Sequence, residues 1–113
     1  MQPRLILWVR LPVRVPSGHE QKGLRPCILI KDPSTVHPIR FPVLLIAPLT
    51  SQLMPEQLLY PRLKAGVANL PVESTVLLDQ LMTIDCQRVE GYIGTLEPSE
   101  YEIIRTGLLG LWN

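Results

Sequence analysis

The chain has 113 residues, 46% of them hydrophobic, which is enough for one domain spanning 1–113 with a single core and too short for two. Its formal net charge of +1 points neither to a strongly basic nucleic-acid binder nor to an acidic tail. The sequence shows no signal-peptide pattern and no apolar stretch long enough to span a membrane, so we expect a cytoplasmic protein.

Twelve prolines divide the chain into short runs of apolar and β-branched residues. Runs of strand length lie at 4–11, 25–31, 41–50, 74–80 and 83–94. The stretch VLLIA within 41–50 is apolar at every position, so this run should be a central strand with both faces buried. Several strands separated by turn signals predict a mainly β fold, a small antiparallel barrel or sandwich.

The segment 97–113 changes from the period of a strand to that of a helix. One helical face carries four apolar side chains, namely Tyr101, Ile104, Leu108 and Leu111. Pro98 suits the first turn, whereas Gly107 and Gly110 each weaken the helix by about 1 kcal/mol relative to alanine. We therefore predict a short C-terminal helix that lies on the barrel.

Charge is unevenly distributed along the chain. Residues 1–40 hold seven basic and two acidic side chains, and residues 73–113 hold two basic and seven acidic ones. The layout is dipolar if the fold keeps the two ends apart. Eight of the eleven cations are arginines, whose planar fork suits phosphate or carboxylate, so an anionic ligand is favoured.

The cysteines do not indicate a disulfide or a metal centre. Cys27 and Cys86 each lie in or beside a run that is typical of strands, so reduced thiols that fill apolar space are the better interpretation. With two histidines and no Cys-x-x-Cys pair, the chain has too few soft ligands for a metal cage. We predict neither a metal nor a cofactor.

The loop GHEQKGLRP, residues 18–26, is the most unusual segment. Gly18 and Gly23 can adopt positive φ and let a ligand approach the main chain, while Pro26 holds Arg25 extended at the start of a strand. An arginine fixed beside a histidine and glycine amides resembles a phosphodiester site. By composition alone, an ordinary surface hairpin is the better interpretation. The loop lacks the lysine and hydroxyl of a P-loop.

Three blocks carry a resemblance to a known family. Residues 18–26, followed by CILI, closely resemble the Gly-His/Ser-Glu-Gln-x-Gly-x-Arg-Pro signature of the MazF/PemK/Kid toxins of bacterial toxin–antitoxin systems. Residues 48–52, PLTSQ, are similar to a second family block, and residues 78–85, LDQLMTID, to a third, with Arg88 near the place of its following arginine. The blocks stand in the family's order over most of the chain.

The resemblance implies an SH3-like antiparallel barrel with a C-terminal helix, usually a homodimer. It also implies a metal-independent endoribonuclease that cleaves single-stranded mRNA at short sequences and arrests translation. A cognate antitoxin of the MazE/PemI kind would neutralise it with an acidic tail in the RNA groove, and contact with DNA is implied only through that antitoxin.

The resemblance assigns roles residue by residue. Arg25 and Thr50 match the family's catalytic arginine and threonine, and His19 matches a histidine that the Kid-type members use. The remaining matched side chains are expected to bind substrate: Glu20, Gln21, Ser51, Gln52, Asp79 and Gln80.

The residue types suit this chemistry. Attack by a ribose 2′-hydroxyl needs a base, a donor for the leaving 5′ oxygen and positive charge near the phosphorane, and none of these jobs needs a metal. Arg25 supplies the charge, Thr50 orients the phosphate, and His19, with a reference pKa near 6.5, is the most suitable base, with Glu20 or Asp79 as substitutes.

Each of these roles has a structural alternative. Arg25 could pair with Asp79 or Glu20, and Thr50 could simply end a strand. His19 is evenly balanced between a base and a loop hydrogen-bond donor. Trp8 and Trp112 could stack on bases, although a core or interface role is the better interpretation of both. Asp79 is better interpreted as a structural partner or a base acceptor than as a catalyst.

The sequence departs from the family pattern at several positions. It begins without the Gly-Asp pair that relatives carry before the first strand. Met82 replaces the basic residue before Ser/Thr-Ile-Asp, and Leu77 replaces the arginine that Kid-type members place before Asp-Gln. Loss of these charges would weaken phosphate binding or change the sequence that is cut.

Two alternative functions remain open. Gyrase poisons of the CcdB type resemble this fold and act through a helix that ends in Trp-Gly-Ile, whereas this chain ends Leu111-Trp112-Asn113. A barrel that binds nucleic acid or an antitoxin without cutting is the third class. The blocks at 18–26 and 48–52 favour the ribonuclease.

Overall fold

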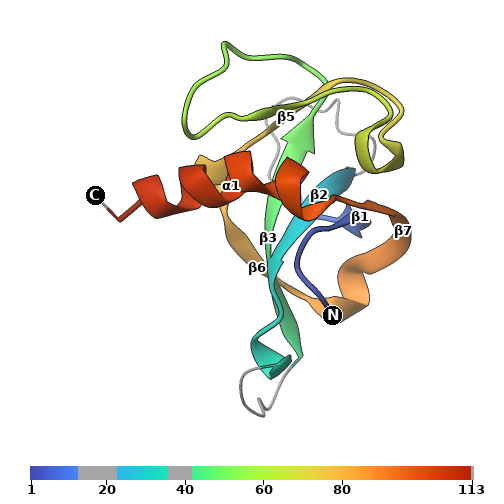
Figure 1. Cartoon of the computed structure of the whole chain (residues 1–113). Coiled ribbons are helices and arrows are strands. Elements are labelled where there is room, and N and C mark those ends of the chain that lie inside the picture. Colours follow the sequence, from blue (N-terminus) through green and yellow to red (C-terminus); the bar gives the residue numbers. More distant parts are fainter. Residues whose placement is uncertain (13–22, 36–41, 113) are drawn as a thin grey trace.

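The computed structural model describes residues 1–12, 23–35 and 42–112, and His19, Glu20 and Gln21 lie outside this part of the chain (Figure 1). Its strands are β1 (Leu5–Arg10), β2 (Leu24–Lys31), β3 (Val43–Thr50), β4 (Arg62–Leu63), β5 (Ser74–Val76), β6 (Met82–Asp85) and β7 (Val89–Thr95). Short 3-10 turns are η2 (Pro33–Thr35), η3 (Val67–Asn69), η4 (Leu78–Gln80) and η5 (Cys86–Arg88). The α-helix α1 (Pro98–Gly110) follows β7.

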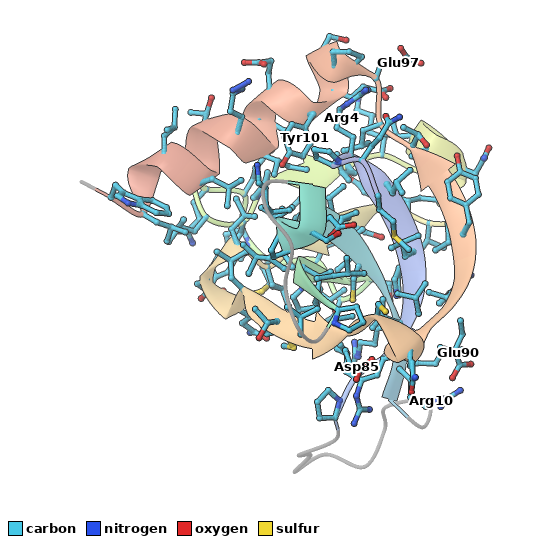
Figure 2. The ribbon with its side chains drawn as sticks, turned by 90° about the horizontal axis from the view of Figure 1, so that it is seen from below. Arg4, Arg10, Asp85, Glu90, Glu97 and Tyr101 are labelled. Atoms are coloured by element: carbon cyan, nitrogen blue, oxygen red, sulfur yellow. The ribbon has the colours of Figure 1, made fainter. Side chains whose placement is uncertain are left out.

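The strands form an antiparallel sheet in the order β4-β5-β3-β2-β1-β7, and β6 also pairs with β3. β3 pairs with β2 along one edge; along the other it pairs first with β6 and then with β5. The prediction that 41–50 holds a central strand is confirmed. β6 and β7 are consecutive and joined by η5, so the sheet curls into a half-barrel (Figure 2). The predicted mainly β barrel with a C-terminal helix is confirmed.

Both faces of this sheet are buried. The inner cluster lies within the curl and contains Leu7, Val9, Cys27, Leu29, Leu44, Ile46 and Ile84. The helix-side cluster lies on the other face and includes Ile6, Ile28, Ala47, Leu49 and Ile104 of α1, which crosses the sheet in Figure 1. Neighbouring residues of β3 enter opposite clusters, which explains why VLLIA is apolar throughout.

Two predicted strands are shorter than expected. The run 74–80 is a strand only as far as Val76, because the chain then turns through η4 and buries Leu78 completely. The run 83–94 divides into β6 and β7 at η5, where Asp85 Oδ1 accepts a hydrogen bond from the backbone N of Gln87 at 2.8 Å. A local side-chain hydrogen bond of this kind competes with the strand ladder.

Helix α1 begins at a capping box. The Glu97 side chain caps the first turn, and the Glu97 backbone N donates to Glu100 Oε1 at 2.7 Å.

The apolar face predicted for this helix is wrong at Leu111, which follows the helix and is 38% exposed. Gly107 is buried there instead: a Cβ at this position would lie 2.5 Å from Leu78 Cδ1 and 2.6 Å from the Leu58 carbonyl oxygen. The glycine permits this close contact.

The fold also mixes the basic and acidic ends of the sequence. β1 lies beside β7, and Arg10 Nε lies 2.6 Å from Glu90 Oε2 (Figure 2). This hydrogen bond raises the pKa of Arg10 and lowers the pKa of Glu90. The fold therefore does not keep the basic and acidic ends of the chain apart along this edge, as a dipolar charge layout would require.

Both cysteines are free thiols, as predicted. Burial raises the pKa of Cys27 to about 12, although the nearby positive charge of Arg25 opposes this shift. Trp112 is 79% exposed, so of the core and interface roles expected for it the core role is wrong, and the interface role stays a prediction. Among the described residues, no helix has the length and apolarity to cross a membrane.

Candidate functional site

The register of two neighbouring strands brings Arg25 and Thr50 together. In the antiparallel ladder between β2 and β3, Cys27 lies opposite Pro48. Two residues farther along each strand, the same register places Arg25 opposite Thr50. Residues two apart on a strand share a face, so both side chains lie on the face of the inner cluster, beyond Cys27 and at its end. Residues 25 positions apart in the sequence therefore become neighbours.

Two hollows meet at this pair. The larger, of about 560 Å³, is lined by Leu11, Arg25, Pro48, Thr50, Gln52, Leu53, Met54, Pro55, Leu77, Gln80 and Met82. The smaller, of about 380 Å³, is lined by Trp8, Leu24, Arg25, Pro26, Leu49, Thr50, Ser51, Gln52, Leu70, Pro71, Val72 and Ser74. Arg25, Thr50 and Gln52 line both hollows and so stand between them.

The Arg25 side chain is placed to bind an anion. It is half-buried, and its guanidinium makes no hydrogen bond or ion pair with the part of the chain that is described. The Thr50 hydroxyl accepts a hydrogen bond from the backbone N of Gln52 at 3.1 Å, which holds the turn after β3 and leaves the hydroxyl hydrogen free to donate. A guanidinium fork and a hydroxyl donor are suited to the oxygens of one phosphate.

Residues 2–111 match the sequence profile of a family described as PemK-like, MazF-like toxins of type II toxin–antitoxin systems. The chain belongs to this family. Solved structures with the same fold include toxin MazF-mt6 of Mycobacterium tuberculosis, with a TM-score of 0.72 and 19% identity over 98% of this chain and 96% of that one. MazF from Deinococcus radiodurans has a TM-score of 0.70 and 20% identity, over 99% and 96% of the two chains.

A third solved structure is an endoribonuclease from a mycobacterial species in complex with its cognate antitoxin. It has a TM-score of 0.66 and 13% identity, over 97% of this chain and 90% of that one. No curated protein sequence matches the chain.

The predicted site residues of this MazF-like toxin divide into three groups. Arg25, Thr50 and Gln52 line both hollows, Ser51 lines the smaller and Gln80 the larger. His19, Glu20 and Gln21 lie outside the described residues, so the structure does not place them. Asp79 lines neither hollow.

Asp79 instead pairs with Tyr60, which no sequence motif indicated. Its Oδ2 accepts a hydrogen bond from the Tyr60 hydroxyl at 2.5 Å. This hydrogen bond is the main cause that raises the pKa of Tyr60, with desolvation and the Asp79 charge adding to it. An ion pair between Arg25 and Asp79, the structural alternative for Arg25, is absent among the described residues.

The positions that depart from the family pattern lie in the site. Leu77 and Met82 both line the larger hollow. Because these two side chains are apolar, Arg25 is the one cation among the described residues that line the two hollows. The larger hollow therefore offers apolar contact at these two positions.

Two further residues position the wall of the larger hollow. The Thr75 Oγ1 accepts from the backbone N of Met54 at 3.3 Å, and Arg62 Nη2 donates to the Met54 carbonyl oxygen at 2.6 Å. The strand ladders place Thr50 opposite Thr75 and Thr75 opposite Arg62, in one row across β3, β5 and β4. No motif indicated these residues, because their role depends on strand pairing.

Proposed function

We propose that this MazF-like toxin is a sequence-specific endoribonuclease that cleaves single-stranded mRNA without a metal. The observation that carries the proposal is the placement of Arg25, whose guanidinium has no partner among the described residues, opposite Thr50 and between two hollows. Membership of the toxin family supports it, as does the shared fold with a mycobacterial endoribonuclease.

The reaction follows from these groups. The 2′-oxygen of the ribose attacks phosphorus, forms a new oxygen–phosphorus bond, and gives its proton to a base. Arg25 stabilises the charge on the phosphorane oxygens, and Thr50 donates to one of them. The bond to the 5′ oxygen then breaks and that oxygen takes up a proton from solvent, which leaves a 2′,3′-cyclic phosphate and a 5′-hydroxyl.

His19 is the proposed base, because imidazole is the group that best accepts a proton near neutral pH. The alternatives are Glu20 and Asp79. The hydrogen bond from Tyr60 occupies one oxygen of Asp79, and this argues against Asp79 as the base. Glu20, Gln21, Ser51, Gln52, Asp79 and Gln80 are proposed to contact the RNA.

The proposal includes partners. The toxin is expected to act in the cytoplasm as a homodimer and to be neutralised by a cognate antitoxin whose acidic side chains mimic phosphates at Arg25. The mycobacterial relative in complex with its cognate antitoxin supports such a partner.

A second candidate function is supported by one observation. Trp112 is 79% exposed, so it is available to a protein target, as the terminal tryptophan of a gyrase poison is. This candidate predicts trapping of gyrase that depends on Trp112 and not on Arg25.

The test is cleavage of labelled single-stranded RNA of varied sequence in EDTA. We expect cleavage by the wild type and a loss of roughly 10²- to 10³-fold in kcat/KM on Arg25→Ala, the loss typical when a donor to a developing oxyanion is removed. Thr50→Val should also reduce the rate. Lys64→Ala is the control for loss of a cation, because Lys64 is exposed after β4 and lines neither hollow.

Two results together would overturn the proposal. The first is that the purified wild type cuts no RNA across varied sequences. The second is that toxicity to growing cells survives Arg25→Ala. Gyrase trapping lost on Trp112→Ala would then support the second candidate.

A further inference from the structure

The smaller hollow has an apolar floor built from three adjacent strands. Trp8 lies opposite Pro26 in the ladder of β1 and β2, and the register of β2 and β3 continues this row to Leu49. These side chains belong to the face that lies opposite Arg25 and Thr50. Arg25 and Thr50 also line this hollow, so they stand at its rim.

The far wall of the hollow is Leu70, Pro71 and Val72, which follow η3. Strand β7 holds this segment closely: a Cβ at Gly94 would lie 2.1 Å from the Ala68 carbonyl oxygen. Asn69 Nδ2 donates to the Ile93 carbonyl at 3.1 Å. The wall is therefore fixed by the sheet before any ligand binds.

Trp8 is fixed as well. Its ring packs over Gly91 of β7, where a Cβ would lie 3.5 Å from Trp8 Cδ1, and the side chain remains half-buried. Ser74 is buried, and its hydroxyl donates to the Val72 carbonyl at 3.0 Å, so it is occupied within the wall. The polar groups that remain for a ligand are those of Ser51 and Gln52 beside Thr50.

This chemistry suits a nucleobase better than a phosphate. The volume of about 380 Å³ lies at the low end of small-ligand sites. An indole with proline and aliphatic neighbours offers a flat apolar surface, on which a base of any sequence can stack. The charge needed for phosphate lies only at the rim, at Arg25.

We propose that the smaller hollow binds one of the two nucleobases that flank the scissile phosphate, stacked on Trp8. This inference rests on the proposed ribonuclease function. With the phosphate held by Arg25 and Thr50 at the rim, an adjacent base turned toward the helix-side face enters the hollow. Ser51 and Gln52 reach the polar edge of that base.

The first experiment measures kcat/KM on an RNA oligonucleotide that contains a site cut by the wild type, and on copies with an abasic ribose at each position in turn. For the wild type, we expect a roughly 5- to 150-fold loss at one of the two flanking positions. Trp8→Ala should lower kcat/KM on the intact RNA by a similar factor and should show no further loss on that abasic RNA.

Two further variants are controls. Trp8→Phe should keep most of the rate that Trp8→Ala loses. Tyr92→Ala removes an aromatic side chain that is 61% exposed on β7, and it should behave as wild type.

The second experiment does not depend on cleavage. In a Trp112→Phe protein, Trp8 is the one remaining tryptophan, and its fluorescence is titrated with an oligonucleotide that carries deoxyribose at the cut site. We expect quenching that is lost when the flanking base is absent. If the wild type cuts no RNA, the same titration is made with oligodeoxynucleotides of varied sequence. Quenching of Trp8 by one of them would then leave the base site standing while the ribonuclease proposal fails.

The inference is overturned if the wild type cuts RNA but both flanking abasic penalties persist in Trp8→Ala. It is also overturned if Trp8→Ala lowers the rate on every substrate by the same factor, since this indicates a structural role. Absence of Trp8 quenching by any bound oligonucleotide would overturn it as well.

Discussion

At the scale of single residues, the backbone of Met54 is held from both sides by side chains of β4 and β5. Thr75 is fully buried, and its hydroxyl accepts from the Met54 N, while Arg62 donates to the Met54 carbonyl. The Arg62 Nε is buried and has no hydrogen-bond partner in the described part of the chain; the nearest carboxylate, Glu73, is 3.9 Å away. Arg62 therefore depends on the Met54 contact.

Thr75→Val should loosen the segment after β3. The substitution keeps the shape of the side chain but removes the acceptor for the Met54 N–H, so we expect a loss of about 1 kcal/mol in the free energy of unfolding. Hydrogen exchange at the Met54 amide should become faster. Urea unfolding and amide exchange measure these effects. Thr83→Val on β6, where threonine is exposed, is the control, and equal effects of the two substitutions would contradict the assignment.

The pair of Tyr60 and Asp79 predicts a pH dependence. The hydrogen bond to the carboxylate raises the pKa of Tyr60, so its stabilising effect is present below the ordinary tyrosine pKa near 10 and is lost as the pH rises through the raised value. Asp79→Asn should therefore make Tyr60 ionise at a lower pH than in the wild type. Phenolate absorbance against pH measures this, and Tyr60→Phe identifies the signal. An unchanged titration would mean that the pair does not form.

At the scale of elements, the two glycines of α1 have different surroundings. A Cβ at Gly107 would lie 2.6 Å from the Leu58 carbonyl oxygen, which is backbone, and 2.5 Å from Leu78 Cδ1. A Cβ at Gly110 would meet the end of the Leu58 side chain at 2.6 Å. Leu58 is 53% exposed, so this side chain has room to move.

We therefore expect opposite effects of alanine at the two positions. Gly107→Ala should lower the free energy of unfolding by about 1 to 3 kcal/mol, because overpacking exceeds the gain in helix propensity. Gly110→Ala should be neutral or stabilise the protein by up to about 1 kcal/mol. Thermal or urea unfolding of both variants provides the measurement. A stabilised Gly107→Ala protein would show that α1 lies farther from the Leu58 backbone than these distances indicate.

At the scale of the whole molecule, an apolar surface remains open beside α1. A hollow of about 570 Å³ is lined by Pro3, Ile30, Lys31, Leu45, Tyr101, Arg105, Leu108, Leu109 and Trp112. Leu109 is 64% exposed and Trp112 is 79% exposed. Contiguous exposed apolar side chains of this kind are typical of protein interfaces, and the proposed homodimer supplies a partner for them.

Leu109→Asp should therefore convert the proposed dimer into a monomer. A charge at the centre of an apolar contact would have to be desolvated without a partner. Sedimentation of the wild type should give twice the chain mass of 12.8 kDa, and the variant should give the single mass. Tyr92→Asp on β7 is the control for adding a charge at an exposed site. A monomeric wild type would remove the basis of this prediction.

The order and type of the main elements follow from the sequence because hydrophobic periodicity is local. VLLIA predicted the central β3, and the period of 97–113 predicted α1. The three blocks likewise indicated the toxin family, which the match over 2–111 confirms. Local periodicity was insufficient at Leu78 and at Cys86, where short 3-10 turns end the predicted strands, because such turns depend on single side-chain contacts.

The relations between distant residues were decided only by the tertiary structure. The resemblance named Arg25 and Thr50, but strand register is what sets them opposite each other between two hollows. The turn η4 directs Asp79 to Tyr60, and the pairing of β4 with β5 brings Arg62 to Met54. Each relation joins residues of different segments, and strand pairing and turns, which no local periodicity encodes, determine which of them meet.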